Sequence, residues 1–167
     1  RTPIFMATGS IPKPDNYDGP ENLYEFMLSS KKDKIPGTAF YYESGQTEAL
    51  GWIIKRLTGK NLAELIQEII WSKLGAEENA LMQLDLIGTD IASGGMRATL
   101  RDLARFGEMM LNDGYYNGQQ IIPEHIIREI KKGGNRKYLA ESNHSHLSGF
   151  SYHNQWWVSH DQFGGYS

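Results

Sequence analysis

The sequence predicts a mainly helical chain with one or two strands near its C-terminus. Two observations support this prediction. Apolar residues recur at helical spacing in several segments between Gln46 and Gly134. Aromatic and β-branched residues then gather in GFSYHNQWWVSH, residues 149–160, which is typical of a strand or of a hairpin with its turn near His153 and Asn154.

Composition narrows the classes of function. The 167 residues are 40% hydrophobic and 22% charged, which is typical of one globular domain. The net charge of -3, with both signs interspersed, gives no basic surface for nucleic acid. The chain has no cysteine, so disulfides, thiolate nucleophiles and cysteine-based metal sites are excluded. No apolar run approaches the roughly 20 residues that span a bilayer.

The distribution of residues predicts three regions within one partial domain. Residues 1–38 are a loop-rich lead-in with one short helix around residues 23–28, residues 39–134 are a helical subdomain, and residues 135–167 are a loop followed by returning strands. The first residues, RTPIFMATGSIPKPD, carry neither an initiator methionine nor a signal peptide. We therefore expect the chain to begin inside a longer protein, and its compartment is left open.

Two adjoining helices are predicted in the first half of the helical subdomain. One starts near Gln46 and ends at Gly59, where a left-handed residue is favoured. The second starts with a capping box formed by Asn61 and Glu64 and stops before Gly75. The apolar stripe of the first helix comprises Ala49, Leu50, Ile53, Ile54 and Leu57.

Two more helices follow a turn-rich segment. Thr99 is a natural N-cap for the third, and Asp102 lies in its first turn, where the helix dipole favours an anion. Pro123 opens the fourth, which the pair Gly133–Gly134 ends. The apolar spacing of the third helix predicts a buried face made of Leu100, Leu103, Ala104, Gly107, Met110 and Leu111.

Three ordered stretches resemble a known family. They are PGTAFYYESGQTEALGWIIKRLTGKNL, IASGGMRATLRDLARFGEMMLNDGYYNGQQIIPEHII and YHNQWW. They are similar to the serine β-lactamase and penicillin-binding-protein-like hydrolases, within the branch of class C type β-lactamases, esterases and 6-aminohexanoate-dimer hydrolases. The resemblance implies that the parent protein has the α/β fold of β-lactamases and transpeptidases, of which this chain is an internal fragment. It implies acyl transfer through a serine ester and no cofactor.

The resemblance assigns a catalytic role to Tyr42. Members of the family use a serine in S-x-x-K as nucleophile, a tyrosine in a Y-x-N type motif for proton transfer, and a third motif on a strand. Tyr42 matches the motif tyrosine, and Ser44 stands where asparagine is usual, as a candidate substrate contact. A phenol of pKa about 10 carries a proton when a nearby ammonium stabilises its phenolate. Tyr41 is the alternative motif tyrosine, and packing is the alternative role of Tyr42.

The other candidate residues have simpler interpretations. Ser29-Ser30-Lys31-Lys32 matches S-x-x-K literally, but its charged, breaker-rich surroundings predict a solvated segment rather than a nucleophile. The family nucleophile is therefore expected before residue 1, and the third motif after residue 167. His144 and His146 lie in a predicted loop without matching carboxylates, so we expect no metal. Trp156 and Trp157 alternate on the predicted strand, which would bury one ring and leave the other, Trp157, for substrate.

Three classes of function follow from these patterns. The first is a fragment of a serine hydrolase acting on a small amide, ester or lactam and inactive by itself. The second is a non-catalytic binding or regulatory member of the same fold, which the serine at position 44 favours. The third is a free-standing helical interaction module. Uncovered apolar helix faces also predict self-association of the isolated chain.

Overall fold

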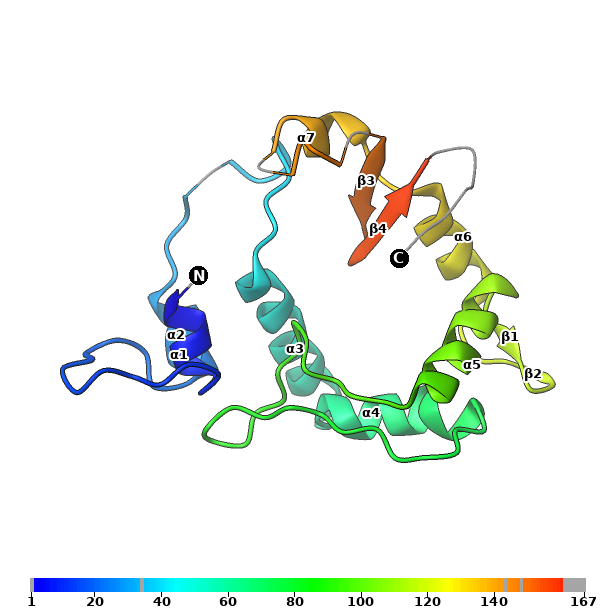
Figure 1. The fold of residues 1–167 in the computed structure, drawn as a ribbon, viewed down its shortest axis with the longest axis horizontal. Helices are drawn as coiled ribbons and strands as arrows, with labels where there is room; N and C mark the ends of the chain where they lie inside the picture. The colour runs from blue at the N-terminus through cyan, green and yellow to red at the C-terminus, as the bar shows by residue number, and fades with distance from the viewer. Residues whose placement is uncertain (1, 34, 143, 148, 161–167) are drawn as a thin grey trace. The chain divides into compact units, whose positions relative to one another are not determined.

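The structure is a computed structural model that describes residues 2–33, 35–142, 144–147 and 149–160 (Figure 1). Within these residues the chain is mainly helical and ends in a hairpin, which confirms the predicted class. The elements are α1 Thr2–Ala7, α2 Leu23–Ser29, α3 Ser44–Thr58, α4 Leu62–Ile69, the 3₁₀ helix η1 Trp71–Lys73, α5 Leu100–Leu111, β1 Tyr115–Tyr116, β2 Gln119–Gln120, α6 Glu124–Lys132, α7 Arg136–Ala140, β3 Phe150–His153 and β4 Trp156–Ser159.

The chain divides into two compact units, each made of two segments. The first unit contains Arg1–Lys31 and Glu43–Arg105, and the second contains Lys32–Tyr42 and Phe106–Ser167. The division falls inside α5, so the first half of this helix belongs to one unit and the second half to the other.

Helices α3 and α4 follow the sequence patterns closely. Gly59 ends α3 with φ of 71°, the left-handed conformation that its position predicts. Asn61 and Glu64 form the predicted capping box, in which each side chain accepts a backbone N–H from the other residue. The turn between the two helices is therefore short, and both ends of the turn are fixed by local hydrogen bonds.

The apolar stripe of α3 is only partly covered. Leu50, Ile53, Ile54 and Leu57 keep 40% to 81% of their surface exposed, whereas the residues that α3 buries are Glu48 and Gly51. A stripe of this kind normally packs against another layer. Self-association of the isolated chain through such faces stays a prediction.

The first unit contains a small apolar cluster that joins two helices to a later segment. Ile4 of α1, Leu23 of α2 and Ile91 form one buried cluster, against which Phe26 packs. Helix α1 was not predicted, because TPIFMA offers too few residues to show a helical period. Helix α2 was predicted, and its N-cap Asn22 accepts the backbone N–H of Glu25.

Buried carboxylates, in addition to the apolar contact of Ile91, connect the helices of this unit to the long segment between α4 and α5. Asp85 accepts the backbone N–H of Leu23, and Asp90 accepts that of Leu62. Asp102 accepts those of Glu77 and Glu78 at 2.9 and 3.2 Å. Charged acceptors make stronger hydrogen bonds than neutral ones, so a few such bonds hold a segment that has little regular structure.

The predicted buried face of α5 is wrong for its leucines and confirmed at Met110, which is buried. Leu100, Leu103 and Leu111 are 50% to 84% exposed, whereas Asp102 is fully buried. Met109, seven positions after Asp102 and therefore on the same side of the helix, is fully buried as well. The helix turns this side inward because Asp102 satisfies backbone groups of residues 77 and 78, a contact that apolar spacing cannot reveal.

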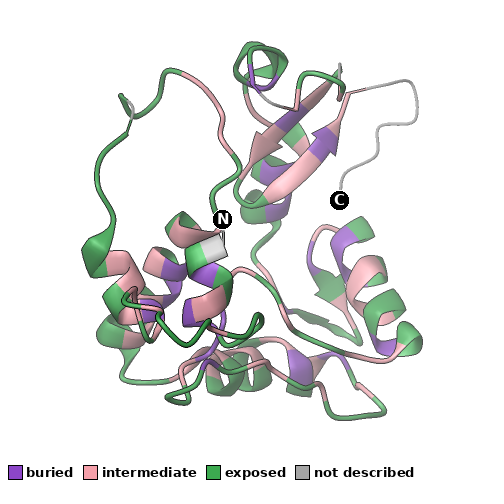
Figure 2. Cartoon of the chain, turned by 60° about the vertical axis from the view of Figure 1, so that its left-hand side comes forward, coloured by how far each residue is buried: buried purple, intermediate pink, exposed green. Residues whose placement is uncertain are grey.

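In the second unit, α6 and α7 pack on the C-terminal hairpin. Pro123 precedes α6, and Gly133 ends it, as predicted. Ile127 and Ile130 are the buried residues of α6, and each hairpin strand carries one buried position, which Figure 2 shows in purple. The sequence did not predict α7 or the short hairpin β1–β2, because both occupy polar stretches of a few residues.

The hairpin of β3 and β4 confirms the predicted strand and turn. The strands pair antiparallel with Tyr152 opposite Trp157, and Asn154 and Gln155 both have positive φ in the two-residue turn. Ser151 joins the hairpin to the end of α6, because its hydroxyl accepts the N–H of Gly134 and lies 2.8 Å from Nε2 of His160. Ser151 is fully buried, so this Ser–His pair connects elements and offers no accessible nucleophile.

None of the helices formed by the described residues is both long enough and apolar enough to cross a bilayer.

Asp102 makes the stability of the first unit depend on pH. Hydrogen bonds from the backbone of Glu77, and then from Thr99 and Glu78, together with the charge of Arg105, hold the pKa of Asp102 below its ordinary 3.8 against the opposing effect of burial. Because the folded pKa is lowered, this stabilisation is present above the unfolded pKa and is lost as the pH falls through the folded pKa. We expect Asp102→Asn to be less stable than the unsubstituted protein at neutral pH, and the difference to shrink below about pH 4.

Urea unfolding of the complete protein at neutral and acidic pH measures this difference. Glu124→Gln is the matched control, because Glu124 forms an exposed ion pair with Arg128 on the same helix. A destabilisation by Asp102→Asn that stays constant from neutral to strongly acidic pH would contradict the proposed linkage.

Candidate functional site

Tyr42 lies in a group of five rings, which we call the aromatic cluster. The ring of Tyr42 stacks on that of Trp157 with centroids 5.9 Å apart and planes 18° apart. Tyr152 meets Tyr42 edge to face at 6.1 Å, and His144 lies at the same centroid distance. Phe40 completes the cluster through contacts with Tyr152 and Trp157 at 4.7 and 5.6 Å. All five residues belong to the second unit.

The hairpin and the segment before α3 build this cluster. Tyr152 and Trp157 are cross-strand partners, so their side chains leave the same face of the hairpin, with ring centroids 5.0 Å apart. The backbone N–H of Phe40 donates to the carbonyl of Tyr138 in α7, which anchors the segment 32–42 to this unit. Tyr42 is therefore held by packing from one side, while 37% of its surface stays exposed.

Tyr152 lies deeper than Tyr42 in the aromatic cluster. Burial raises the pKa of Tyr152, and the neighbouring Tyr42 raises it further, because two phenolates at this distance would repel. Tyr152 is therefore a neutral phenol at physiological pH, and its hydroxyl donates to the side chain of Gln155 at 3.0 Å.

The two tryptophans differ from the expected pattern. Trp156 and Trp157 do lie on opposite faces of the hairpin, since Trp156 stacks on Phe106 and Trp157 belongs to the aromatic cluster. The expectation that one ring is buried is wrong, because both side chains are only half-buried. A hairpin of two short strands lacks the neighbouring strands that would cover either face completely.

Ser44 and Tyr41 have different surroundings from Tyr42. Ser44 is the first residue of α3, is half-buried and belongs to the first unit. Tyr41 is half-buried in the second unit. Its role as the alternative motif tyrosine stays open.

Ser29 lies where a catalytic serine would be ineffective. It is the last residue of α2, it is exposed, and its hydroxyl donates to the carbonyl of Phe26 at 2.7 Å. Lys32 lies beyond the end of this helix, so the two residues of the literal S-x-x-K motif do not share a helical turn.

Sequence patterns missed three members of the aromatic cluster. Tyr152 could have been found, because a turn at residues 154 and 155 places it opposite Trp157. Phe40 and His144 gave no such signal, since they come from segments without periodicity. The described residues hold no group of three His, Cys, Asp or Glu side chains arranged for a metal ion.

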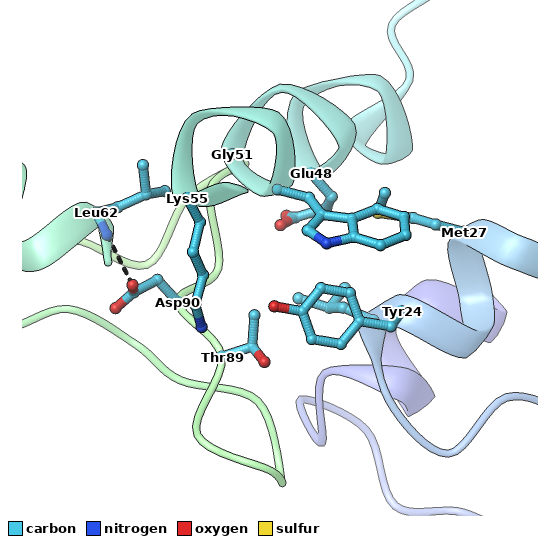
Figure 3. A pocket seen from close by; sticks show the side chains of 10 residues that line it. Tyr24, Met27, Glu48, Gly51, Lys55, Leu62, Thr89 and Asp90 are labelled. Carbon is cyan, nitrogen blue, oxygen red and sulfur yellow. Dashed lines mark hydrogen bonds between the residues drawn. The ribbon is translucent and has the colours of Figure 1, made fainter. Parts of the chain in front are cut away.

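A small pocket lies within the first unit. Helices α2 and α3 and the segment around Thr89 line it, and its volume of about 20 Å³ suits a single water molecule (Figure 3). Lys55 extends from α3 toward Thr89, and Asp90 binds the N–H of Leu62 at 2.8 Å. A pocket of this size cannot hold an organic substrate.

Comparison with known proteins places the chain in a family. The family described as Beta-lactamase matches residues 6–166. The 6-aminohexanoate-dimer hydrolase of Paenarthrobacter ureafaciens is 34% identical over 151 residues, which cover 89% of this chain and 38% of that protein.

Two solved structures are similar over nearly all of the chain. A protein from Bacillus anthracis assigned as a 6-aminohexanoate-dimer hydrolase has 42% identity and a TM-score of 0.88, and the match covers 99% of this chain and 42% of that one. The octameric penicillin-binding protein homologue from Pyrococcus abyssi has 17% identity and a TM-score of 0.66, which supports the shared fold alone.

The chain spans about two fifths of the length of these relatives. The family match extends over almost all residues of the chain. The fold agrees with that of the Bacillus anthracis structure at 42% identity and with that of the Pyrococcus abyssi structure at 17% identity. The chain therefore belongs to the beta-lactamase family, as a part of its domain that is similar to 6-aminohexanoate-dimer hydrolases.

Proposed function

We propose that the complete protein is a serine hydrolase that cleaves a small amide, ester or lactam through an acyl-serine intermediate. The nucleophilic serine and its lysine, in an S-x-x-K motif, lie in the part of the protein that precedes residue 1. Similarity to two relatives named as 6-aminohexanoate-dimer hydrolases favours a short amide as substrate. The proposed reaction needs no cofactor.

The position of Tyr42 is the observation that carries this proposal. Its ring is packed on Trp157, its surface is partly accessible, and it directly precedes α3 in the motif that the family uses for proton transfer. A packed ring fixes the direction of its hydroxyl, which proton transfer requires. Trp157 is proposed to contact substrate beside Tyr42, and Ser44 is proposed to replace the asparagine of the motif.

The proposed chemistry has two stages. In the first, the phenolate form of Tyr42 takes the proton of the serine hydroxyl while the serine oxygen attacks the carbonyl carbon of the substrate. Tyr42 then passes the same proton to the leaving amine or alcohol. In the second, the phenolate of Tyr42 accepts a proton from water, and the water oxygen attacks the carbonyl carbon of the acyl-serine ester. The bond to the serine oxygen then breaks, Tyr42 passes the proton to that oxygen, and the acid is released with the serine hydroxyl restored. The lysine ammonium stabilises the phenolate of Tyr42 between these transfers.

Replacing Tyr42 tests this role. Tyr42→Phe keeps the ring that stacks on Trp157 and removes the hydroxyl, so we expect folding to persist and kcat to fall by roughly 10²–10⁴-fold. Tyr41→Phe in the complete protein is the matched control and should change kcat far less. Steady-state hydrolysis of a chromogenic ester, together with thermal melting, measures both effects. Equal rates for Tyr42→Phe and the unsubstituted enzyme would return Tyr42 to a packing role.

Covalent labelling tests where the nucleophile lies. A fluorophosphonate reacts with an activated serine, whereas Ser29 is exposed at the end of α2 and its motif partner Lys32 lies beyond that helix. We expect the complete protein to be labelled once, at a serine outside these 167 residues, and the isolated chain to stay unlabelled. Peptide mass spectrometry locates the label. Labelling of Ser29 would refute the proposed site, and a complete protein without any reactive serine would favour a non-catalytic binding member of the family.

A further inference from the structure

Glu48 is a buried carboxylate in the first half of α3, and both of its oxygens bind one loop. Oε2 accepts the backbone N–H of Ala92 at 3.0 Å, and Oε1 accepts that of Ser93 at 2.9 Å. Only 4% of Glu48 is exposed. Burying a carboxylate is costly unless its oxygens receive hydrogen bonds, so this pair of contacts is what allows Glu48 to lie there. One side chain thus joins the helix to a loop more than forty residues later.

Gly51 gives the same loop a place to approach the helix. A Cβ at position 51 would lie 2.6 Å from the Cβ of Ala92, closer than two such atoms approach in proteins. Gly51 and Glu48 are three positions apart, so they lie on the same face of α3. This face of α3 therefore offers the loop at Ala92–Ser93 two features. The carboxylate of Glu48 accepts the two N–H groups of the loop, and Gly51 leaves room for the Ala92 side chain.

The loop is also held from its other side. Ile91, the residue before Ala92, is buried, and its N–H donates to the carbonyl of Gln83 at 3.0 Å. The N–H of Gln83 in turn donates to the carbonyl of Gly95. These contacts fix the internal shape of the loop, whereas Glu48 fixes its position on α3.

We propose that Glu48 is a positioning residue of the hydrolase site, which holds Ala92–Ser93 in register with the first turn of α3. This role rests on the proposed function. Ser44 and Glu48 are four positions apart and therefore face the same side of α3, so the loop is fixed relative to the motif position that Ser44 occupies. Glu48 itself touches backbone amides and is not a catalytic residue.

A positioning role and a purely structural role predict different kinetics. If Glu48 only stabilises the fold, its replacement lowers the melting temperature but leaves the rate of the folded enzyme unchanged. If it positions the loop for the reaction, kcat falls even where the variant is fully folded, because small displacements at a reacting centre cost up to about 10²-fold.

The test uses Glu48→Gln in the complete protein. Glutamine has nearly the same shape as glutamate, but an NH₂ group replaces one of the two carboxylate oxygens. This NH₂ group is a donor, so it cannot accept a hydrogen bond from the backbone N–H that it faces. We expect amide exchange of residues 92 and 93 to become about tenfold faster or more, because their acceptor is weakened. We also expect kcat for a chromogenic ester to fall by roughly 10- to 100-fold, with KM changing far less. Both are measured well below the melting temperature.

Two other variants complete the design. Glu68→Gln is the matched control, because Glu68 is an exposed carboxylate on α4 that pairs with Lys60, and it should leave both readouts unchanged. Gly51→Ala is the second test, because its methyl group displaces Ala92 without removing a charge. It should accelerate exchange and lower kcat in the same direction, and it decides the matter if Glu48→Gln fails to fold.

Each outcome is informative. Faster exchange together with a lower kcat supports the proposal. Faster exchange with an unchanged kcat would assign Glu48 a structural role only, and unchanged exchange would show that the contacts do not hold the loop; either result overturns the proposal. If the unsubstituted protein hydrolyses neither ester nor amide, the proposed function fails and the positioning role with it, while the exchange measurement still reports whether Glu48 holds the loop.

Discussion

Hydrogen bonds from backbone amides to buried carboxylates are the interactions on which the first unit depends. The segment between α4 and α5 has little regular structure of its own, and Ile91 is its one residue in the small apolar cluster with Ile4 and Leu23. Each carboxylate accepts hydrogen bonds from main-chain N–H groups that have no partner in a helix or a sheet. The contact therefore gives the N–H group an acceptor and gives the buried carboxylate a donor. The acidic residues that act in this way are Glu48, Asp85, Asp90 and Asp102. Removing any one leaves buried donors unsatisfied and frees a length of loop.

The second unit is organised by rings instead. A hairpin with a two-residue turn presents Tyr152 and Trp157 on one face, and the segment before α3 adds Phe40 and Tyr42. Aromatic pairs favour a limited set of offset and edge-to-face geometries, so a cluster of them orients each ring more narrowly than aliphatic packing does. The orientation of Tyr42 is thus set by residues more than a hundred positions later. This explains how a tyrosine in a loop can be placed well enough to transfer a proton.

Local chemistry was predictable from the sequence, and long-range contacts were not. The capping box at Asn61, the left-handed Gly59 and the hairpin at residues 150–159 all follow from neighbours within a few positions, and the structure confirms them. The inward face of α5 could not be predicted, because Asp102 turns inward to reach backbone groups some 24 residues away. Likewise Tyr42 was identified by its motif, whereas the cluster around it required the fold. The family resemblance supplied what spacing alone could not.

Tyr42 is the residue that we propose to transfer the proton in a serine hydrolase. The measurement that tests it most directly is a crystal structure of the complete protein after reaction with a phosphonate ester. We expect the Tyr42 hydroxyl to lie within about 2.6–3.2 Å of the oxygen of the modified serine, with its ring still stacked on Trp157. An adduct whose serine oxygen contacts Tyr41 or another base, while Tyr42 lies out of hydrogen-bond reach, would contradict it.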